Sequence, residues 1–212
     1  MRFLLLLSLL GFAFCKTGID SISAISTSTF TCLKNNGYSF FVFRVWRQVN
    51  NYDDTGIQNI LNARAAGITD VDGYIYPCTS SSCPPGANQV EAVIDKLNEK
   101  GAKIGMLWLD VEGTWPSDKT KNQQFIQGMA DAAVKKGVKV GVYTGQYSWP
   151  DIVGSWTGMS KYPLWWPNYN NDPGFGKYPP YGGWTKPLVH QYGGDLTTRP
   201  CGLGDMDINY KD

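Results

Sequence analysis

The sequence predicts an α/β fold, a modified and shortened TIM-like barrel of eight strands with about five helices. Short apolar runs alternate with segments of helical periodicity from residue 17 onward, which is typical of βα units. The helical periodicity stops after residue 163, and residues 16–212 are fewer than the roughly 250 of a typical eight-fold barrel. A doubly wound open sheet is the rival architecture, but the Gly-rich phosphate turn after its first strand is missing from residues 20–24.

Eight short apolar segments are the candidate strands. They cover residues 17–22, 39–46, 71–76, 104–111, 138–144, 163–169, 188–192 and 206–210. Apolar runs of this length are typical of strands that are buried on both faces of a parallel sheet. The first and last strands are neighbours in a closed barrel, so we expect the two ends of the domain to lie side by side.

Apolar residues at helical spacing predict four helices between the early strands and a short fifth helix after residue 144. Their apolar positions are Phe30 and Leu33; Ile57, Ile60 and Leu61; Val90, Val93, Ile94 and Leu97; Phe125, Met129 and Ala133; and Trp149, Ile152, Val153 and Trp156. Gly37, Gly67, Gly101 and Gly137 mark helix ends. Residues 167–187 are rich in proline, glycine and aromatic residues, which predicts an irregular excursion instead of a crossover helix.

Residues 1–15 resemble a secretory signal peptide. One basic residue precedes a short apolar run, which ends in small residues at Ala13 and Cys15. The run is shorter than the roughly 20 residues that span a bilayer. We therefore expect cleavage after Cys15, a single catalytic barrel domain over residues 16–212, and secretion to the extracellular space or to a lysosomal or digestive lumen.

Cleavage there leaves four cysteines, Cys32, Cys78, Cys83 and Cys201. An even number suits an oxidising compartment and predicts two disulfides. Four cysteines allow three pairings, and the sequence does not choose among them. The short Cys78–Cys83 spacing favours a small closed loop, which leaves Cys32 to tie the beginning of the domain to Cys201 near its end. One Cys-x4-Cys with one histidine makes no recognisable zinc set.

The composition narrows the choice of partners and cofactors. Lys plus Arg total 19 against 18 Asp plus Glu, so we expect neither nucleic acid nor membrane as a partner. We expect no cofactor or metal. The acidic residues could bind magnesium, but the sequence has no phosphate-cradling loops of the kind that accompany a magnesium site. The chain should be a monomer. Aromatic residues crowd the helix-poor third and favour a sugar ligand: Tyr162, Trp165, Trp166, Tyr169, Phe175, Tyr178, Tyr181, Trp184 and Tyr192.

Acidic residues stand at three predicted strand ends. Asp110 and Glu112 close an apolar strand, and side chains two apart on a strand point to one face about 6.5–7 Å apart. Asp20 and Asp207 belong to the adjoining first and last strands. Each acid taken alone fits a solvent-facing strand end or cap equally well. Together, without a Ser/His/Asp arrangement, they predict glycoside hydrolysis, in which one carboxylic acid protonates the leaving oxygen and another stabilises the cationic centre.

The ordered motifs resemble the lysozymes of glycoside hydrolase family 25. The matching segments are Gly18-Ile19-Asp20 with Ser23, Asp110-Val111-Glu112, Gly141-Val142-Tyr143-Thr144, Gln191-Tyr192 and Met206-Asp207-Ile208-Asn209-Tyr210. The resemblance covers residues 17–210. It implies a secreted, antibacterial or digestive enzyme that cleaves the β-1,4 bond between N-acetylmuramic acid and N-acetylglucosamine in bacterial peptidoglycan, with retention. Its partner would be the bacterial cell-wall polysaccharide.

The resemblance also implies roles for individual residues. Glu112 is the acid/base, and Asp110 stabilises or orients the charged intermediate, directly or through the substrate's acetamido group. The residues expected to bind substrate are Asp20, Asp207, Tyr143, Gln191, Tyr192 and Trp166. We expect the more deeply set Asp110 to keep its negative charge while Glu112 holds the proton. His190 replaces the aromatic residue that usually precedes Gln-Tyr in the family, and we expect it to be structural.

Two other functions fit parts of the pattern. A chitinase-like hydrolase also ends its fourth barrel strand in Asp-x-Glu and uses the acetamido group of its substrate. A sugar-binding barrel that has lost catalysis is the non-enzymatic alternative. Loss of catalysis usually removes the acid, and Glu112 is present.

Overall fold

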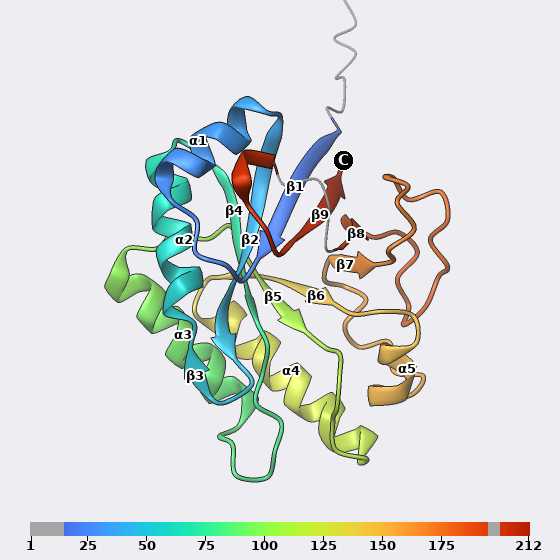
Figure 1. Ribbon diagram of the computed structural model, residues 1–212. Helices are drawn as coiled ribbons and strands as arrows, with labels where there is room; N and C mark the ends of the chain where they lie inside the picture. The colour runs from blue at the N-terminus through green and yellow to red at the C-terminus, as the bar shows by residue number, and fades with distance from the viewer. Residues whose placement is uncertain (1–14, 195–199) are drawn as a thin grey trace, which may run out of the picture.

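The computed structural model describes residues 15–194 and 200–212 (Figure 1). Its strands are β1 (Lys16–Ser21), β2 (Tyr38–Arg47), β3 (Asn51–Tyr52), β4 (Asp70–Ile75), β5 (Met106–Asp110), β6 (Lys139–Tyr143), β7 (Leu164–Pro167), β8 (Val189–Gly193) and β9 (Met206–Lys211). Its helices are α1 (Thr27–Asn35), α2 (Asp54–Ala65), α3 (Gly86–Lys100), α4 (Lys119–Lys135), α5 (Ser148–Val153) and the short 3-10 turn η1 (Pro200–Gly202). Residues 1–14 of the predicted signal peptide lie outside the described residues.

Eight of these strands close into a barrel. Their order is β1-β9-β8-β7-β6-β5-β4-β2, and pairing of β1 with β2 completes the circle. The two-residue β3 adds an antiparallel edge to the end of β2. All eight predicted strands are present, and with five α-helices in the described residues the predicted fold class is confirmed.

The last strand differs from the expected parallel pattern, because β9 runs antiparallel to both β1 and β8. A parallel return needs a crossover of a dozen or more residues, usually a helix. The short connection from β8 to β9 contains no helix longer than η1 in its described part. The reversal places the beginning of β9 beside the end of β1, where Asp20 and Asp207 are direct partners in the ladder. The prediction that these two acids come together is confirmed.

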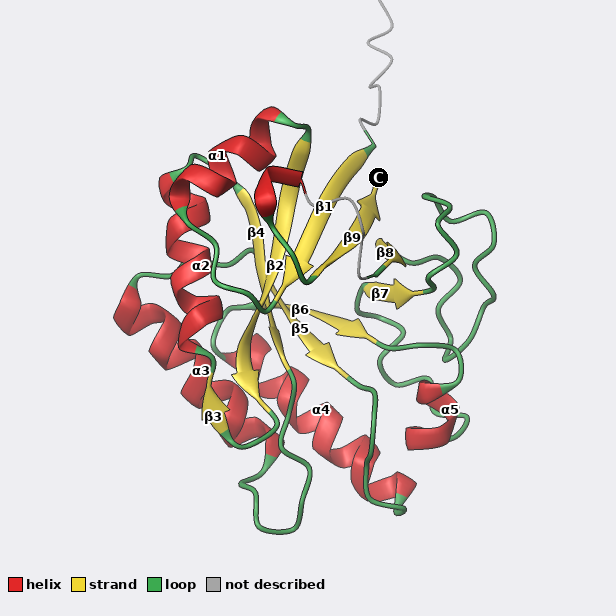
Figure 2. Cartoon of the chain, in the orientation of Figure 1, coloured by secondary structure: helices red, strands yellow, loops and turns green. Residues whose placement is uncertain are grey.

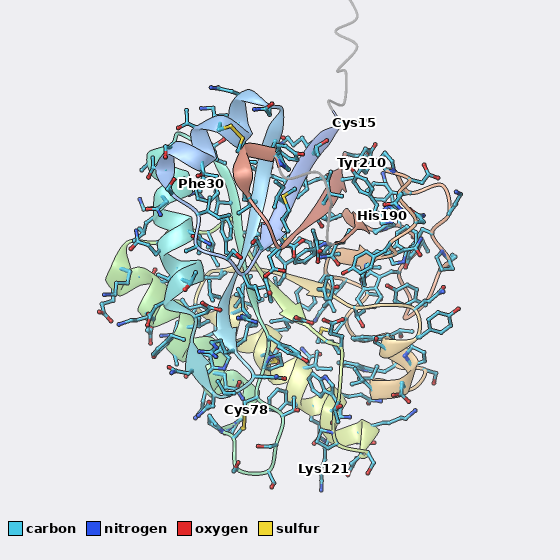
Figure 3. The ribbon with its side chains drawn as sticks, viewed as in Figure 1. Cys15, Phe30, Cys78, Lys121, His190 and Tyr210 are labelled. Carbon is cyan, nitrogen blue, oxygen red and sulfur yellow. A yellow bond between two sulfur atoms is a disulfide. The ribbon has the colours of Figure 1, made fainter. Side chains whose placement is uncertain are left out.

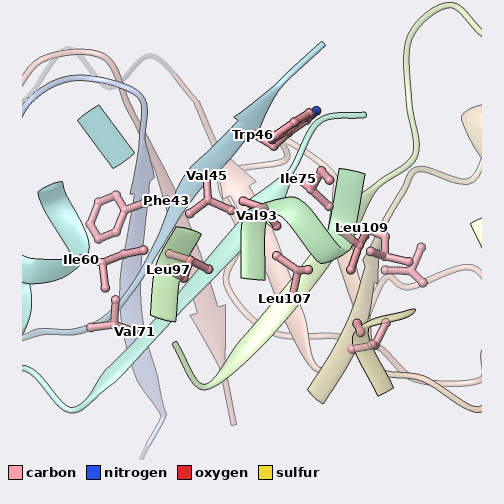
Figure 4. Close-up of a cluster of buried hydrophobic side chains, with 14 of the residues drawn as sticks. Phe43, Val45, Trp46, Ile60, Val71, Ile75, Val93, Leu97, Leu107 and Leu109 are labelled. Carbon is pink, nitrogen blue, oxygen red and sulfur yellow. The ribbon is translucent and has the colours of Figure 1, made fainter. Parts of the chain in front are cut away.

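Alternation along the strands divides side chains between the barrel interior and an outer layer. In β5, Leu107 and Leu109 face outward and pack with Val93 and Leu97 of α3 (Figure 4). The intervening Trp108 faces the barrel interior. A shift of one residue in the pairing register of a strand would move its interior side chains to the outer layer and its outer side chains to the interior. The buried outer layer therefore fixes which residues of each strand reach the interior and the mouth of the barrel.

The helices α1, α2 and α4 begin at capping side chains, and glycines follow the ends of the helices. Ser26 accepts a hydrogen bond from the amide of Thr29 at the start of α1, and Asp118 accepts one from Lys121 at the start of α4. The predicted terminators Gly37, Gly67, Gly101 and Gly137 all have positive φ, a conformation that glycine adopts without steric cost. Within the described residues, no helix has the length and apolar character that crossing a membrane requires.

The last third of the chain covers its side of the barrel with loop instead of helix, as predicted (Figure 2). Residues 168–188, called the aromatic loop below, lie against β7 and β8. Trp184 of this loop packs edge-on against Trp149 of α5 at 4.9 Å between ring centroids. Tyr178 packs in the same way against Trp166 at 5.2 Å. These rings fill the space that crossover helices occupy elsewhere around the barrel.

Two disulfides join the pairs that the spacing favours. Cys32 in α1 is bonded to Cys201 in η1, and Cys78 is bonded to Cys83. The first bond ties the beginning of the barrel to the segment that leads into β9. Cys15 is a free, exposed cysteine.

Candidate active site

A pocket opens at the carboxyl ends of the parallel strands. It is lined by Asp20, Tyr74, Asp110, Glu112, Tyr143, Trp165, Tyr169, Gln191 and Asp207. Six of the eight sequence-predicted site residues are in this set: both predicted catalytic acids, Asp20, Asp207, Tyr143 and Gln191. Barrel closure is what brings them together, because they come from β1, β5, β6, β8 and β9.

Gln191 of β8 organises one side of the pocket. Its Nε2 donates to Asp20 Oδ1 at 2.9 Å and to Asp207 Oδ2 at 3.1 Å. Its Oε1 accepts hydrogen bonds from the hydroxyls of Tyr143 at 2.8 Å and Tyr169 at 2.9 Å. The side-chain amide thus uses both of its donors and both lone pairs. This fixed network holds two acids and two tyrosines in register.

Asp20 lies at the buried end of this network. Its Oδ1 also accepts a hydrogen bond from Asn209 Nδ2 at 2.6 Å. Burial and the negative charge of Asp207, against the hydrogen bonds from Asn209 and Gln191, raise the pKa of Asp20 from 3.8 to about 8. Asp20 is therefore a neutral acid at mildly acidic pH.

Replacing this acid should change how stability depends on pH. Because the folded protein holds the Asp20 proton up to about pH 8 and the unfolded chain releases it near 3.8, the free energy of unfolding falls as pH rises between these values. Asp20→Asn keeps the acceptor oxygen and never ionises. The variant should match the parent at about pH 4 and exceed it in stability at about pH 8. Urea unfolding at both pH values tests this, and a parallel pH dependence in the two proteins would contradict it.

Asp110 ends β5 inside the pocket. It is 5% exposed, and its Oδ1 is the one buried side-chain nitrogen or oxygen without a hydrogen-bond partner in the described residues. Burial raises its pKa well above the usual range, the charges of Glu112 and Asp20 add to this, and Arg44 opposes it. Burial and the two neighbouring acids act against the charged form, so the expectation that Asp110 keeps its charge stays a prediction.

Glu112 follows two residues after the end of β5 and is partly exposed. Burial raises its pKa, and the negative charge of Asp207 raises it further. The backbone around it is fixed: Trp115 Nε1 donates to the Glu112 carbonyl at 3.0 Å, and Thr144 Oγ1 donates to the Val111 carbonyl at 2.7 Å. Glu112 is thus a positioned carboxylic acid that retains its proton to a higher pH than a free side chain does.

A second pocket shares Glu112 with the first. Its lining is Gln48, Tyr76, Pro77, Cys78, Thr79, Ser80, Glu112, Thr114 and Trp115. The disulfide-closed turn that begins at Cys78 forms one wall of it. Glu112 therefore stands at the boundary between two cavities, where an acid can reach the bond that joins two sugar units.

The aromatic residues of the pocket differ in part from those expected. Trp165 lines it and packs edge-on against Tyr143, with 4.7 Å between ring centroids, while its Nε1 donates to Asn209 Oδ1 at 2.8 Å. The structure places Trp166 and Tyr192 outside this pocket. Because successive side chains of β7 alternate, Trp166 points to the outer layer, where it stacks on His190.

Three pocket residues were missed as site residues: Tyr74, Trp165 and Tyr169. The alternation of inward positions along β4 and β7 is the signal that could have identified the first two. Tyr169 lies in the aromatic loop beyond β7, where no periodicity applies. Among the described residues, no group of three or more His, Cys, Asp or Glu side chains is arranged to hold a metal ion.

Known proteins resemble this chain along most of its length. A family model described as lysozyme-like protein 1 matches residues 12–192. Lysozyme-like protein 5 of Caenorhabditis elegans is 49% identical over 92% of this chain and 91% of its own. Probable GH family 25 lysozyme 2 of Dictyostelium discoideum is 38% identical over 99% of both chains. A solved muramidase from Trichobolus zukalii shares the fold, with a TM-score of 0.68 and 19% identity over 91% of this chain and 92% of its own. The chain belongs to the glycoside hydrolase family 25 lysozymes.

Proposed function

We propose that this lysozyme is secreted and hydrolyses, with retention, the β-1,4 bond between N-acetylmuramic acid and N-acetylglucosamine in bacterial peptidoglycan. The observation that carries the proposal is the pair of acids at the end of β5, Asp110 within the strand and Glu112 two residues beyond it. Glu112, with a raised pKa, stands between two cavities, and the unpartnered Asp110 carboxyl group lines the first of them. Membership of the lysozyme family supports the reaction class.

Glu112 supplies the proton in the first step. The bond between the anomeric carbon and the bridging oxygen breaks, its electron pair stays on the leaving oxygen, and that oxygen takes the Glu112 proton. The sugar that keeps the anomeric carbon lies in the pocket lined by Asp110, and the leaving sugar lies in the second pocket. In the second step the Glu112 carboxylate takes a proton from the attacking water.

Asp110 acts through the acetamido group of the substrate. The raised pKa of Asp110 disfavours the charged form that a carboxylate nucleophile needs. Its unpartnered Oδ1 instead accepts the acetamido N–H of the sugar. The acetamido oxygen then attacks the anomeric carbon from the opposite face, and water later displaces it. Two inversions at this carbon give net retention.

The pH dependence of activity follows from the raised carboxyl pKa values. Activity requires protonated Glu112, so it should fall as pH rises through the raised pKa of that group. A second limb should appear at lower pH, where Asp110 is neutral and carries no negative charge to oppose the cationic centre. We expect a bell-shaped profile of kcat/KM with its maximum on the acidic side, measured on purified peptidoglycan from about pH 3 to pH 8. A maximum above neutral pH would contradict the assignment.

Secretion follows from the signal-like residues 1–15 and is supported by the two disulfides, which persist in oxidising compartments. The amino terminus of the secreted protein should be Lys16. Sequencing of that terminus tests the proposal, and a secreted protein that begins with Met1 would contradict it.

Parallel assays on two polymers separate the proposed function from its rivals. The protein should clear a suspension of bacterial walls and leave chitin oligomers largely intact. Faster cleavage of the chitin oligomers would indicate a chitinase-like hydrolase. Binding of walls without a fall in turbidity would indicate a sugar-binding barrel.

A further inference from the structure

His190 occupies a buried position behind the catalytic pocket. It precedes Gln191 on β8, and because side chains alternate along a strand it points away from the pocket, into the outer layer. It is 0% exposed and lies beneath the aromatic loop. Figure 3 shows it beside Tyr210, its ladder partner on β9. The reaction proposed above assigns it no part.

Both ring nitrogens of His190 contact carbonyl oxygens. Nδ1 lies 2.7 Å from the carbonyl oxygen of Gly174, and Nε2 lies 3.0 Å from that of Asn168. A carbonyl oxygen only accepts hydrogen bonds, and a neutral imidazole has a single N–H to donate. The imidazolium form alone satisfies both contacts. In the neutral form one nitrogen would direct a lone pair at a carbonyl oxygen.

The surroundings of the ring include groups that favour its charged form. The Trp166 indole of β7 stacks on it at 4.2 Å between centroids, with 20° between the planes. The negative charge of Asp172 also favours the imidazolium. The other titratable or charged groups on the surrounding elements are Tyr192 on β8; Asp207, Tyr210 and Lys211 on β9; Tyr169, Lys177, Tyr178, Tyr181 and Lys186 in the aromatic loop; and Asp212 at the end of the chain.

The carbonyl groups of Asn168 and Gly174 lie on either side of the pocket residue Tyr169 along the chain. Asn168 immediately precedes Tyr169, and its amide donates to the Gln191 carbonyl at 2.9 Å. The Tyr169 hydroxyl donates to Gln191 Oε1 at 2.9 Å and lies 3.3 Å from Asp207 Oδ2. His190 therefore holds residues 168–174 at both ends, with Tyr169 directed into the pocket between them.

We propose that His190 is a positioning residue whose imidazolium, bound to the carbonyl oxygens of Asn168 and Gly174, keeps Tyr169 in the catalytic pocket at acidic pH. When the ring loses its proton, one of the two contacts is lost and residues 168–174 loosen. Burial lowers the pKa of His190 below its usual value, against the two carbonyl contacts, so the transition falls on the acidic side of neutrality. The catalytic consequence rests on the function proposed above.

Three variants test the proposal through activity. His190→Phe keeps an aromatic ring to stack on Trp166 but has no donor, and His190→Gln offers one donor that does not titrate. The ratio of kcat/KM between parent and His190→Phe should be about tenfold larger at acidic pH than above the His190 pKa, because the neutral ring of the parent keeps one contact and loses the other, the equivalent of one hydrogen bond to a charged group. The ratio of kcat/KM between His190→Gln and His190→Phe should be independent of pH, because neither variant titrates at this position. In a Tyr169→Phe background, His190→Phe should have little further effect, because the hydroxyl to be positioned is gone.

A second measurement does not depend on catalysis. His190 is the one histidine of the sequence, so its ring signal in an NMR titration gives its pKa directly. Amide exchange within residues 168–174 should rise in the parent as pH passes this pKa, beyond the intrinsic rise seen in His190→Phe. This holds whether or not the protein cleaves peptidoglycan, so it separates failure of the inference from failure of the proposed function. A flat activity ratio, an exchange pattern shared by parent and variant, or an undiminished effect in the Tyr169→Phe background would overturn the inference.

Discussion

Glu112→Gln should lower kcat on peptidoglycan by a factor on the order of 10²–10⁴ and leave KM close to that of the parent. Glutamine has the size and hydrogen-bonding capacity of the protonated acid, so it preserves the boundary between the two pockets. It has no proton to transfer, and the leaving oxygen must then depart as an alkoxide. Steady-state kinetics on soluble peptidoglycan fragments measure both parameters.

Two further variants show whether the loss of activity is specific to the acids of the site. Glu99→Gln changes the same side chain on the exposed surface of α3 and should leave kcat unchanged. Asp110→Asn should also lower kcat, because the amide cannot carry the negative charge that opposes the cationic centre. Wall lysis by Glu112→Gln within a few-fold of the parent would rule out Glu112 as the acid. The sugar-binding alternative would then become the leading interpretation.

Removal of the Cys32–Cys201 disulfide should destabilise the protein far more than removal of the Cys78–Cys83 disulfide. The first closes a loop with a sequence separation of 169 residues and the second one of 5. In the chain-entropy model, loops of these lengths contribute about 5 and about 2 kcal/mol. The long closure also ties α1 to η1 at the entrance to β9, whose first residues include Asp207.

Paired serine replacements measure the difference without leaving an unpaired thiol. Cys32→Ser with Cys201→Ser should show a lower urea midpoint than Cys78→Ser with Cys83→Ser, at similar m-values. Equal midpoints, or a larger loss from the short loop, would contradict the expectation. The short-loop variant should instead change cleavage kinetics, because its turn forms a wall of the pocket beside Glu112.

The strands and helices could be predicted because their signals are local. Apolar runs bounded by turn residues mark each barrel strand, and glycines in the left-handed conformation mark the helix ends, as at Gly101. The direction of β9 could not be predicted, because it depends on how the preceding connection returns to the barrel. The residue pattern of β9 is compatible with both parallel and antiparallel pairing with its neighbours. The pairing of Asp20 with Asp207 required only that the barrel close.

The candidate site was predictable where acids end strands and less so elsewhere. Trp165 and Trp166 are adjacent and chemically alike, so only the register of β7 decides which one reaches the pocket. Tyr169 enters from an irregular loop, and the ring of His190 holds that loop by contacts with backbone carbonyl groups. The raised pKa of Asp110 depends on its desolvation in the closed barrel, which residue spacing along a strand does not reveal.

Product analysis of digested peptidoglycan tests the proposed reaction most directly. Purified walls are incubated with the protein, the new reducing ends are reduced with borohydride, and the fragments are analysed by mass spectrometry, with Glu112→Gln as the matched control. Cleavage as proposed yields fragments that end in reduced N-acetylmuramic acid in the parent digest and almost none in the control. Reduced N-acetylglucosamine at the new ends, or equal release by the two proteins, would contradict the assignment of Glu112 as the acid of a muramidase.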